Sequence, residues 1–364
     1  GVTATMNHLI SWRTAAHLVA SLACVGAWAQ TPAPEPGPSS IAAVAVPVAV
    51  PVAVPVAAAA LLPAEAFFKN RDVLDAQLSP SGTQLAFTTA ASSKRVSLFV
   101  VDLSPSGKAS RVVSFSDADV VRFNRVNNNR FVFSVADLET GSGEDQHTAP
   151  GLYGVDADGG NLRMLVARRT GAVVVAGGRS GREALPYNHQ LLHVPLPEPG
   201  VENDEIVVGT LVFGGNNDLI EVVPQWLDTR TGRTRFMNLK APDGAVGWLF
   251  DSSGEARVAM AWRSGKQSVH WRGPGQSEWR MLSESDLMRA PFTPRHVDDA
   301  GNLYVTRQRG PQGFSELARY DFERRAPADV PWVSMPGFDY AGSVLSTRRG
   351  GPAAGVRVET DAET

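Results

Sequence analysis

The chain has 364 residues, of which 43% are hydrophobic and 20% are charged, so it can bury a large core. Its 34 Lys and Arg residues nearly balance its 37 Asp and Glu residues, giving a formal charge of -3. This balance supplies no basic field for a phosphate backbone, and we expect no nucleic acid partner. Because Cys24 is the only cysteine, an intrachain disulfide and a multi-cysteine metal site are both excluded.

Residues 1–29 have the layout of a secretory signal peptide. Arg13 precedes an apolar run from Leu18 to Ala27, and small residues occupy the alternate positions of Ala27-Trp28-Ala29. We predict cleavage after Ala29, and therefore an exported protein in the periplasm or the extracellular space. The apolar run is shorter than the ~20 residues that cross a bilayer, so no membrane span is expected.

Residues 30–62 form a linker rich in Ala, Val and Pro. Pro47, Pro51 and Pro55 are spaced four apart, and each proline would remove a hydrogen bond from a helical turn. We therefore expect a disordered, extended and semi-rigid spacer. A tether that holds the following domain away from a surface or a partner remains the functional alternative.

From Gln77 onward, short β-rich runs alternate with turns in which glycine follows an oxygen-bearing residue. Asp and Ser side chains can bond the backbone two residues ahead, and glycine supplies the positive φ that closes a hairpin. The predicted strands include Leu85 to Phe87, Ser97 to Leu103, Arg130 to Val135 and Gly151 to Val155. The predicted turns are Ser79-Pro80-Ser81-Gly82, Ser104-Pro105-Ser106-Gly107, Asp156-Ala157-Asp158-Gly159, Asp228 to Gly232, Asp251-Ser252-Ser253-Gly254 and Asp298-Asp299-Ala300-Gly301.

The order of these turns predicts the architecture. Some turns lead into a short apolar strand and others end one, and the two kinds recur at an imperfect period of about 40–50 residues, as in propeller blades. The sequence therefore predicts an all-β fold, a β-propeller of four-stranded blades over residues 63–364. A β-sandwich is the alternative, although a sandwich is usually complete within about 100 residues.

The motifs also resemble a known family. Ala64-Glu65-Ala66-Phe67-Phe68-Lys69-Asn70 is followed by the Ser79 turn, by Leu98 to Leu103, by Gly151 to Gly159, by Trp248 to Ala259 and by Leu303-Tyr304-Val305. In this order they resemble the opening of secreted bacterial serine peptidases of the prolyl oligopeptidase family, in the dipeptidyl-peptidase and acylaminoacyl-peptidase branch. The resemblance covers the chain from about Pro63 to its end.

The resemblance implies a propeller followed by an α/β-hydrolase domain with a Ser, Asp and His triad. The nucleophile of such a domain lies in Gly-x-Ser-x-Gly, because only glycine fits beside the serine in the tight strand-to-helix turn. Gly178-Arg179-Ser180-Gly181 is one residue short and Gly313-Phe314-Ser315-Glu316-Leu317 lacks the second glycine, so we interpret both as loop or turn sequence. We expect the last blades and the triad to lie beyond Thr364, and this incomplete propeller alone to be inactive.

The implied function is a lid that admits peptide substrates to the missing catalytic domain and excludes folded proteins. No catalytic, cofactor-binding or metal-binding residue is assigned within the chain, no cofactor is indicated, and no substrate-binding residue is singled out. The alternative is a stand-alone periplasmic propeller that acts as a binding scaffold.

Two possible metal sites have simpler explanations. His189 and His193 are four residues apart, as in zinc peptidases, but Gln190 replaces the general-base Glu and the surrounding residues read as a strand. We interpret them as structural histidines. The segment Asp156 to Asn161 starts like a calcium loop, yet Ala167 stands where a bidentate Glu is needed, so a hairpin turn is expected.

Other polar and aromatic groups are interpreted in the same way. The acidic loop Glu139 to Asp145 is expected to be solvated, with binding of a substrate amino terminus as its alternative. The arginine pairs Arg168-Arg169, Arg324-Arg325 and Arg348-Arg349 are expected on surface turns, although an arginine near a pore could hold a peptide carboxylate. The tryptophans expected to fill the packing between sheets are Trp226, Trp248, Trp262, Trp271, Trp279 and Trp332.

Overall fold

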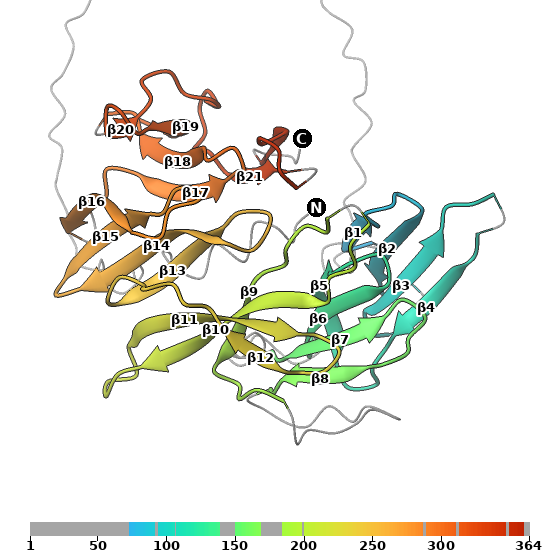
Figure 1. Ribbon diagram of the computed structural model, residues 1–364. Helices are drawn as coiled ribbons and strands as arrows, with labels where there is room; N and C mark the ends of the chain where they lie inside the picture. The colour runs from blue at the N-terminus through green and yellow to red at the C-terminus, as the bar shows by residue number, and fades with distance from the viewer. Residues whose placement is uncertain are drawn as a thin grey trace, which may run out of the picture. The chain divides into compact units, whose positions relative to one another are not determined.

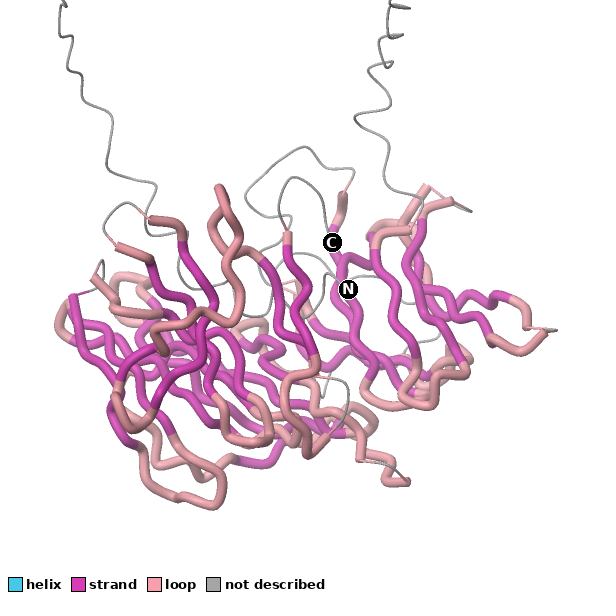
Figure 2. The backbone as a smooth tube through the Cα atoms, turned by 90° about the horizontal axis from the view of Figure 1, so that it is seen from above, coloured by secondary structure: helices cyan, strands magenta, loops and turns pink. Residues whose placement is uncertain are grey.

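The computed structural model describes residues 73–359 except 92–93, 106, 139–149, 169–183, 199, 287–288, 311–312 and 347–348. In this part of the chain every regular element is a β-strand (Figure 2), and no helix is a candidate for crossing a membrane. The predicted signal peptide, the linker, the segment Ala64 to Asn70, the acidic loop and the Gly178 motif lie outside the described residues.

The strands form five four-stranded antiparallel sheets, in each of which the strands follow one another in chain order (Figure 1). Sheet 1 contains β1 (Asp75–Leu78), β2 (Gln84–Thr89), β3 (Ser97–Asp102) and β4 (Ala109–Val113). Sheet 2 contains β5 (Asp119–Arg125), β6 (Arg130–Ala136), β7 (Leu152–Asp156) and β8 (Arg163–Val166). Sheet 3 contains β9 (His189–His193), β10 (Glu205–Phe213), β11 (Leu219–Asp228) and β12 (Thr234–Phe236).

The C-terminal half of the described chain repeats this arrangement. Sheet 4 contains β13 (Ala245–Phe250), β14 (Ala256–Arg263), β15 (Lys266–Trp271) and β16 (Arg280–Asp286). Sheet 5 contains β17 (Thr293–Val297), β18 (Leu303–Gln308), β19 (Ser315–Asp321) and β20 (Ala326–Pro327). Sheet 6 consists of β21 (Gly342–Leu345) and β22 (Gly355–Val358).

The predicted turns at Ser79, Asp156, Asp228, Asp251 and Asp298 are confirmed, whereas Ser106 of the predicted Ser104 turn lies outside the described residues. The turns that begin at Ser79, Asp251 and Asp298 join the first two strands of a sheet, and those that begin at Asp156 and Asp228 join the last two. The first group contains the turns predicted to lead into a short apolar strand, and the second contains those predicted to end one. The repeat is less regular than predicted. A long connection separates the end of β8 at Val166 from the start of β9 at His189, and the β10–β11 hairpin has strands of nine and ten residues.

Glycine is required at one of these turns for two reasons. Gly254 has a φ of 88°, which other residues rarely adopt. A Cβ atom at this position would also collide with the ring of Trp226 from the neighbouring sheet. The turn and the packing of sheet 3 on sheet 4 therefore depend on the same residue.

Side chains that alternate along the strands pack sheets 2 to 5 against a neighbouring sheet on each face. In β13, Trp248 and Phe250 belong to the apolar cluster with sheet 3, whereas Leu249 belongs to the cluster with sheet 5. Clusters of the same kind join sheets 1 and 2, sheets 2 and 3, and sheets 5 and 6. Successive four-stranded meanders packed face to face are the blades of a β-propeller, so the predicted fold class is confirmed.

Five of the six predicted tryptophans belong to or pack against these clusters, whereas Trp262 lines a small cavity between sheets 4 and 5. Trp226, Trp248 and Trp271 are buried, and Trp279 and Trp332 pack against the clusters while partly exposed.

The packing between sheets 1 and 2 predicts that replacing a buried aromatic side chain by alanine strongly lowers the free energy of unfolding. Phe133 is 1% exposed and stacks on Tyr153 with ring centroids 5.4 Å apart, whereas Phe236 is 83% exposed. We expect Phe133→Ala to lower the free energy of unfolding by about 3–5 kcal/mol, and Phe236→Ala to change it by less than about 0.5 kcal/mol. Urea denaturation followed by circular dichroism measures both, and equal effects would contradict the assigned packing.

Candidate functional site

The polar side chains gather at one edge of the sheets. In an antiparallel meander the first and third strands run in the same direction, so the first and third turns lie at the same edge. We call this edge the turn edge, and the turns there that form the polar contacts are residues 79–83, 126–129, 156–161, 228–233, 251–255 and 298–302.

Hydrogen bonds along the turn edge connect each sheet to the next. Backbone and side-chain donors and acceptors both take part, and each bond joins turns or connections from consecutive sheets. They are Ser81 N to Asn128 Oδ1 at 3.0 Å, Asn127 Nδ2 to Asp204 Oδ1 at 2.9 Å, Leu196 N to Ser252 O at 2.8 Å, Ser252 N to Asp299 Oδ1 at 2.8 Å, and Gly350 N to Asp299 Oδ2.

The first polar centre lies between sheets 2 and 3. Arg130 is fully buried; its Nη1 donates to Asp156 Oδ1 at 3.0 Å and its Nη2 to the carbonyl of Thr229 at 2.6 Å. Arg230 approaches the same carboxylate from sheet 3, and its Nη1 lies 3.1 Å from both oxygens of Asp156. Its Nε donates to Asp204 Oδ2 at 2.7 Å. Two guanidinium groups from different sheets therefore share one buried carboxylate.

The chain leaves space for the buried guanidinium at Gly154 of β7. A Cβ atom there would lie 2.6 Å from Nη2 of Arg130, so a side chain at this position would displace the arginine. Burial lowers the pKa of Arg130, and its hydrogen bond to Asp156 acts against this effect. Burial raises the pKa of Asp156, but hydrogen bonds from Asn161 and the arginines outweigh it and leave the pKa below its ordinary value. The carboxylate is therefore ionised at neutral pH.

The second polar centre joins sheets 4, 5 and 6. Asp299 accepts hydrogen bonds from the backbone and the hydroxyl of Ser252. Asp298 accepts from the Tyr304 hydroxyl at 3.0 Å and from the Ala353 amide at 3.1 Å. Burial first, and then the hydrogen bond to Asp298, raise the pKa of Tyr304 to about 12. These carboxylates cap turns and hold adjacent sheets together.

A serine and a histidine meet beside this centre. His296 Nε2 lies 3.1 Å from Ser346 Oγ, and burial lowers the pKa of His296 to about 4. A nucleophilic triad also needs a carboxylate bonded to the imidazole. The hydrogen bonds to Asp298 instead come from Asn302, Tyr304 and Ala353. Among the residues that the structure describes, no carboxylate is hydrogen-bonded to this imidazole.

The histidines singled out in the sequence lie on a strand, as predicted. His189 begins β9 and His193 ends it, so their Cα atoms are separated by four strand residues, about 13 Å. Both ring nitrogens of His189 are within hydrogen-bonding distance of protein oxygens, at 3.0 Å from Pro186 O and 2.9 Å from Thr210 Oγ1. The described residues contain no cluster of three or more His, Cys, Asp or Glu that could hold a metal ion.

The structure corrects one sequence interpretation and confirms another. The Gly313 motif was interpreted as loop or turn sequence, but Ser315 to Leu317 form the start of β19, because they pair with β18. The segment Asp156 to Asn161 is the predicted hairpin turn, and its first carboxylate is occupied by Asn161 and the two arginines.

The three arginine pairs singled out in the sequence differ in where their described members lie and in their ion pairs. Arg324 lies in a turn and donates to Asp329 at 2.6 Å. Arg349 forms an exposed ion pair of 3.2 Å with Glu198, which belongs to the connection between β9 and β10. Arg168 follows β8, whereas Arg169 and Arg348 lie outside the described residues.

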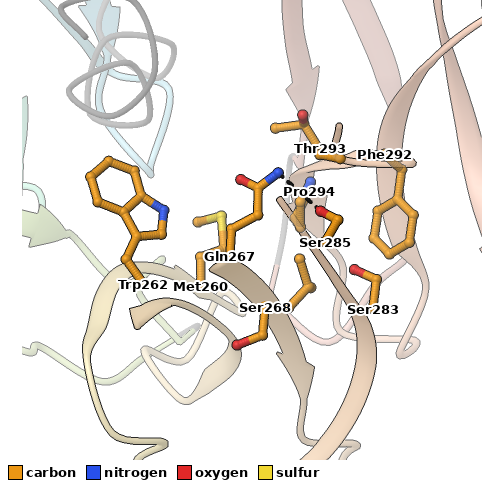
Figure 3. Close-up of a pocket in the computed structure, with 11 residues that line it drawn as sticks. Met260, Trp262, Gln267, Ser268, Ser283, Ser285, Phe292, Thr293 and Pro294 are labelled. Carbon is orange, nitrogen blue, oxygen red and sulfur yellow. Dashed lines mark hydrogen bonds between the residues drawn. The ribbon is translucent and has the colours of Figure 1, made fainter. Parts of the chain in front are cut away.

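A small cavity between sheets 4 and 5 is too small to be a substrate site (Figure 3). Its volume is about 10 Å³, which is about the space of one water molecule. Met260 and Phe292 contribute apolar surface, and Gln267 donates to Ser285 Oγ at 3.3 Å. This cavity belongs to the packing between the two sheets.

No family model matches the chain, and no curated protein matches its sequence. Three of the solved structures that it matches have 13–14% sequence identity. TolB from Acinetobacter baumannii shows 14% identity over 71% of this chain and 55% of its own length, with a TM-score of 0.35. Acylaminoacyl peptidase from Pyrococcus horikoshii shows 13% identity over 81% and 45%, with a TM-score of 0.42. The β-propeller domain of the trilobed protease from Pyrococcus furiosus shows 13% identity over 69% and 67%, with a TM-score of 0.36.

The solved structures that the chain resembles thus include a peptidase and the β-propeller domain of a protease. The chain spans about half the length of TolB and of acylaminoacyl peptidase.

The first polar centre generates a stability prediction. We expect Asp156→Ala to lower the free energy of unfolding by about 3–5 kcal/mol, because it leaves the buried Arg130 without its carboxylate. Asp243→Ala removes a carboxylate of 80% exposure from an ion pair with Arg263, and should cost less than about 1 kcal/mol. Chemical denaturation of both variants tests the difference, and a small loss for Asp156→Ala would show that Arg130 does not depend on this partner.

The histidine beside the second centre predicts a pH dependence. Its folded pKa of about 4 lies below the unfolded value of 6.5, so the unfolded chain binds more protons between these pH values. The contribution of His296 to the free energy of unfolding is fully present above about pH 6.5. It should decrease by about 3 kcal/mol as the pH decreases to about 4. His189 and His270, whose pKa values burial also lowers, act in the same direction. His296→Gln should therefore reduce the slope of the unfolding free energy against pH without abolishing it. An unchanged slope would show that the pKa of His296 is not lowered in the folded protein.

Proposed function

We propose that residues 63–364 form the substrate-gating propeller of an exported serine peptidase of the prolyl oligopeptidase family. The order of the family-like motifs along the meander carries this proposal. The Ser79 and Asp251 motifs form first turns of sheets 1 and 4, and the segment Gly151 to Gly159 forms the third strand and third turn of sheet 2. The Ser79 and Asp251 motifs therefore share one position of the blade, and Gly151 to Gly159 shares another with Leu98 to Leu103, which includes the third strand of sheet 1.

The catalytic step is assigned to a further domain encoded after Thr364. Such a domain would hydrolyse peptides through an acyl-enzyme formed on a serine. In the described part of this chain, a serine hydroxyl meets an imidazole at Ser346 and His296, 3.1 Å apart, and at Ser268 and His270, 2.9 Å apart. Among the described residues, neither imidazole has a hydrogen bond to a carboxylate, which a triad requires. The propeller would contribute selection by size, since unfolded and short peptides pass a restricted entrance that a folded protein cannot enter.

Export is part of the proposal. The arrangement of Arg13, the apolar run and Ala27-Trp28-Ala29 favours translocation and cleavage after Ala29, and the protein would act in the periplasm or the extracellular space.

The decisive test uses the complete gene product. We expect the reading frame to continue after the Thr364 codon into a Gly-x-Ser-x-Gly motif with later Asp and His residues. The purified full-length protein should hydrolyse an unfolded polypeptide at least about 100-fold faster than the same polypeptide held within a folded domain. A fluorophosphonate probe, which reacts with the nucleophilic serine of serine hydrolases, should label a serine beyond residue 364.

Two controls separate the parts of this proposal. The chain of residues 30–364 alone should neither hydrolyse peptides nor take up the label, and labelling within it would overturn the assignment of chemistry to a further domain. Equal rates on folded and unfolded substrates would refute gating alone. A reading frame that ends without the serine motif would refute the peptidase proposal and favour the stand-alone scaffold.

A further inference from the structure

An open cleft of about 460 Å³ adjoins the first polar centre at the turn edge, and arginines dominate its lining. Arg163 lies at the start of β8 in sheet 2, whereas Arg230, Thr231, Gly232 and Arg233 belong to the turn between β11 and β12 in sheet 3. We call these five residues the arginine cleft. Its volume is in the range of small-molecule sites.

Two of the arginines are held in place by the protein. Arg163 Nη1 donates to the carbonyl of Thr231 at 2.9 Å, which ties sheet 2 to the turn of sheet 3. Arg230 is fixed from the buried side by Asp156 and Asp204. A guanidinium held in this way loses less conformational entropy on binding than a freely rotating one.

The acidic groups around the cleft are already engaged. Asp228 accepts hydrogen bonds from the backbone amides of Arg230 and Thr231, and Asp204 accepts from Arg230 and Asn127. These carboxylates therefore have their hydrogen bonds within the protein.

Arg233 differs from its neighbours. Its side chain is exposed and forms no ion pair with any residue that the structure describes. The cleft thus combines positioned guanidinium groups with one that forms no ion pair within the described part of the chain.

We propose that the arginine cleft binds a ligand through a compact oxyanion, a carboxylate or a phosphate group. Guanidinium groups match both anions through paired, charge-assisted hydrogen bonds, and the open cleft admits the group from solvent. This binding uses only residues of the present chain, so it stands or falls independently of the peptidase proposal.

Calorimetric titration of the chain at low ionic strength tests the proposal, with inorganic phosphate in one arm and N-acetylaspartate in the other. We expect at least one anion to bind with a dissociation constant in the millimolar range, and its affinity to fall as salt screens the charges. The arm that gives the tighter binding identifies the preferred anion. NMR titration of the same samples detects binding that releases no heat. If neither phosphate nor N-acetylaspartate produces heat or a chemical-shift change, the proposal is wrong.

Variants locate the binding. Arg233→Gln should weaken it at least about fivefold, since one charge-assisted interaction is lost, and Arg163→Gln should weaken it as well. Arg111→Gln, which alters an exposed arginine on β4, serves as the matched control and should bind like the parent. Circular dichroism establishes that each variant is folded. Equal binding by the Arg233, Arg163 and Arg111 variants would show that the anion binds elsewhere.

Discussion

The structure depends on sheets that are apolar on both faces. Alternation along β13 places Trp248 and Phe250 on one face and Leu249 on the other, and each set packs in the cluster with a neighbouring sheet. A sheet of this kind exposes apolar surface unless neighbours cover both faces. The meander therefore repeats as a series of packed blades, and the faces of the sheets leave little room for polar chemistry.

Polar groups are consequently concentrated where the strands end. The turn edge collects the oxygen-bearing residues that begin each hairpin, and their carboxylates have two tasks. Asp228 and Asp251 bond backbone amides of their own turns, whereas Asp156 and Asp299 bond groups from the neighbouring sheet. Asp298 does both, because it accepts from the amide of Asn302 in its own turn and from that of Ala353. The feature that closes a hairpin thus also connects blades, and it places charged groups together at one edge.

The sequence predicted several strands and turns, because a turn depends on residues within a few positions, and the order of the turns along the chain predicted the fold class. Gly254 and the Asp251 turn illustrate this local information. The sequence analysis missed the start of β19, where Ser315 pairs with β18. The first polar centre was not predictable in the same way. Arg130 bonds to Asp156, 26 residues away, and to Thr229, 99 residues away. In the sequence Arg130 is merely the polar first residue of an apolar strand, and only the packing of sheet 2 on sheet 3 shows why it is buried.

The same packing explains why the arginine cleft has the chemistry of a binding site. Removing Arg130 from water costs free energy unless a carboxylate is close, and Asp156 supplies it. Arg230 then shares that carboxylate, so two positive charges surround one negative charge at this point of the turn edge. Its second carboxylate partner, Asp204, restores the balance inside the protein. The exposed guanidinium of Arg233 forms no ion pair among the described residues, and an anion from solvent would supply the opposite charge.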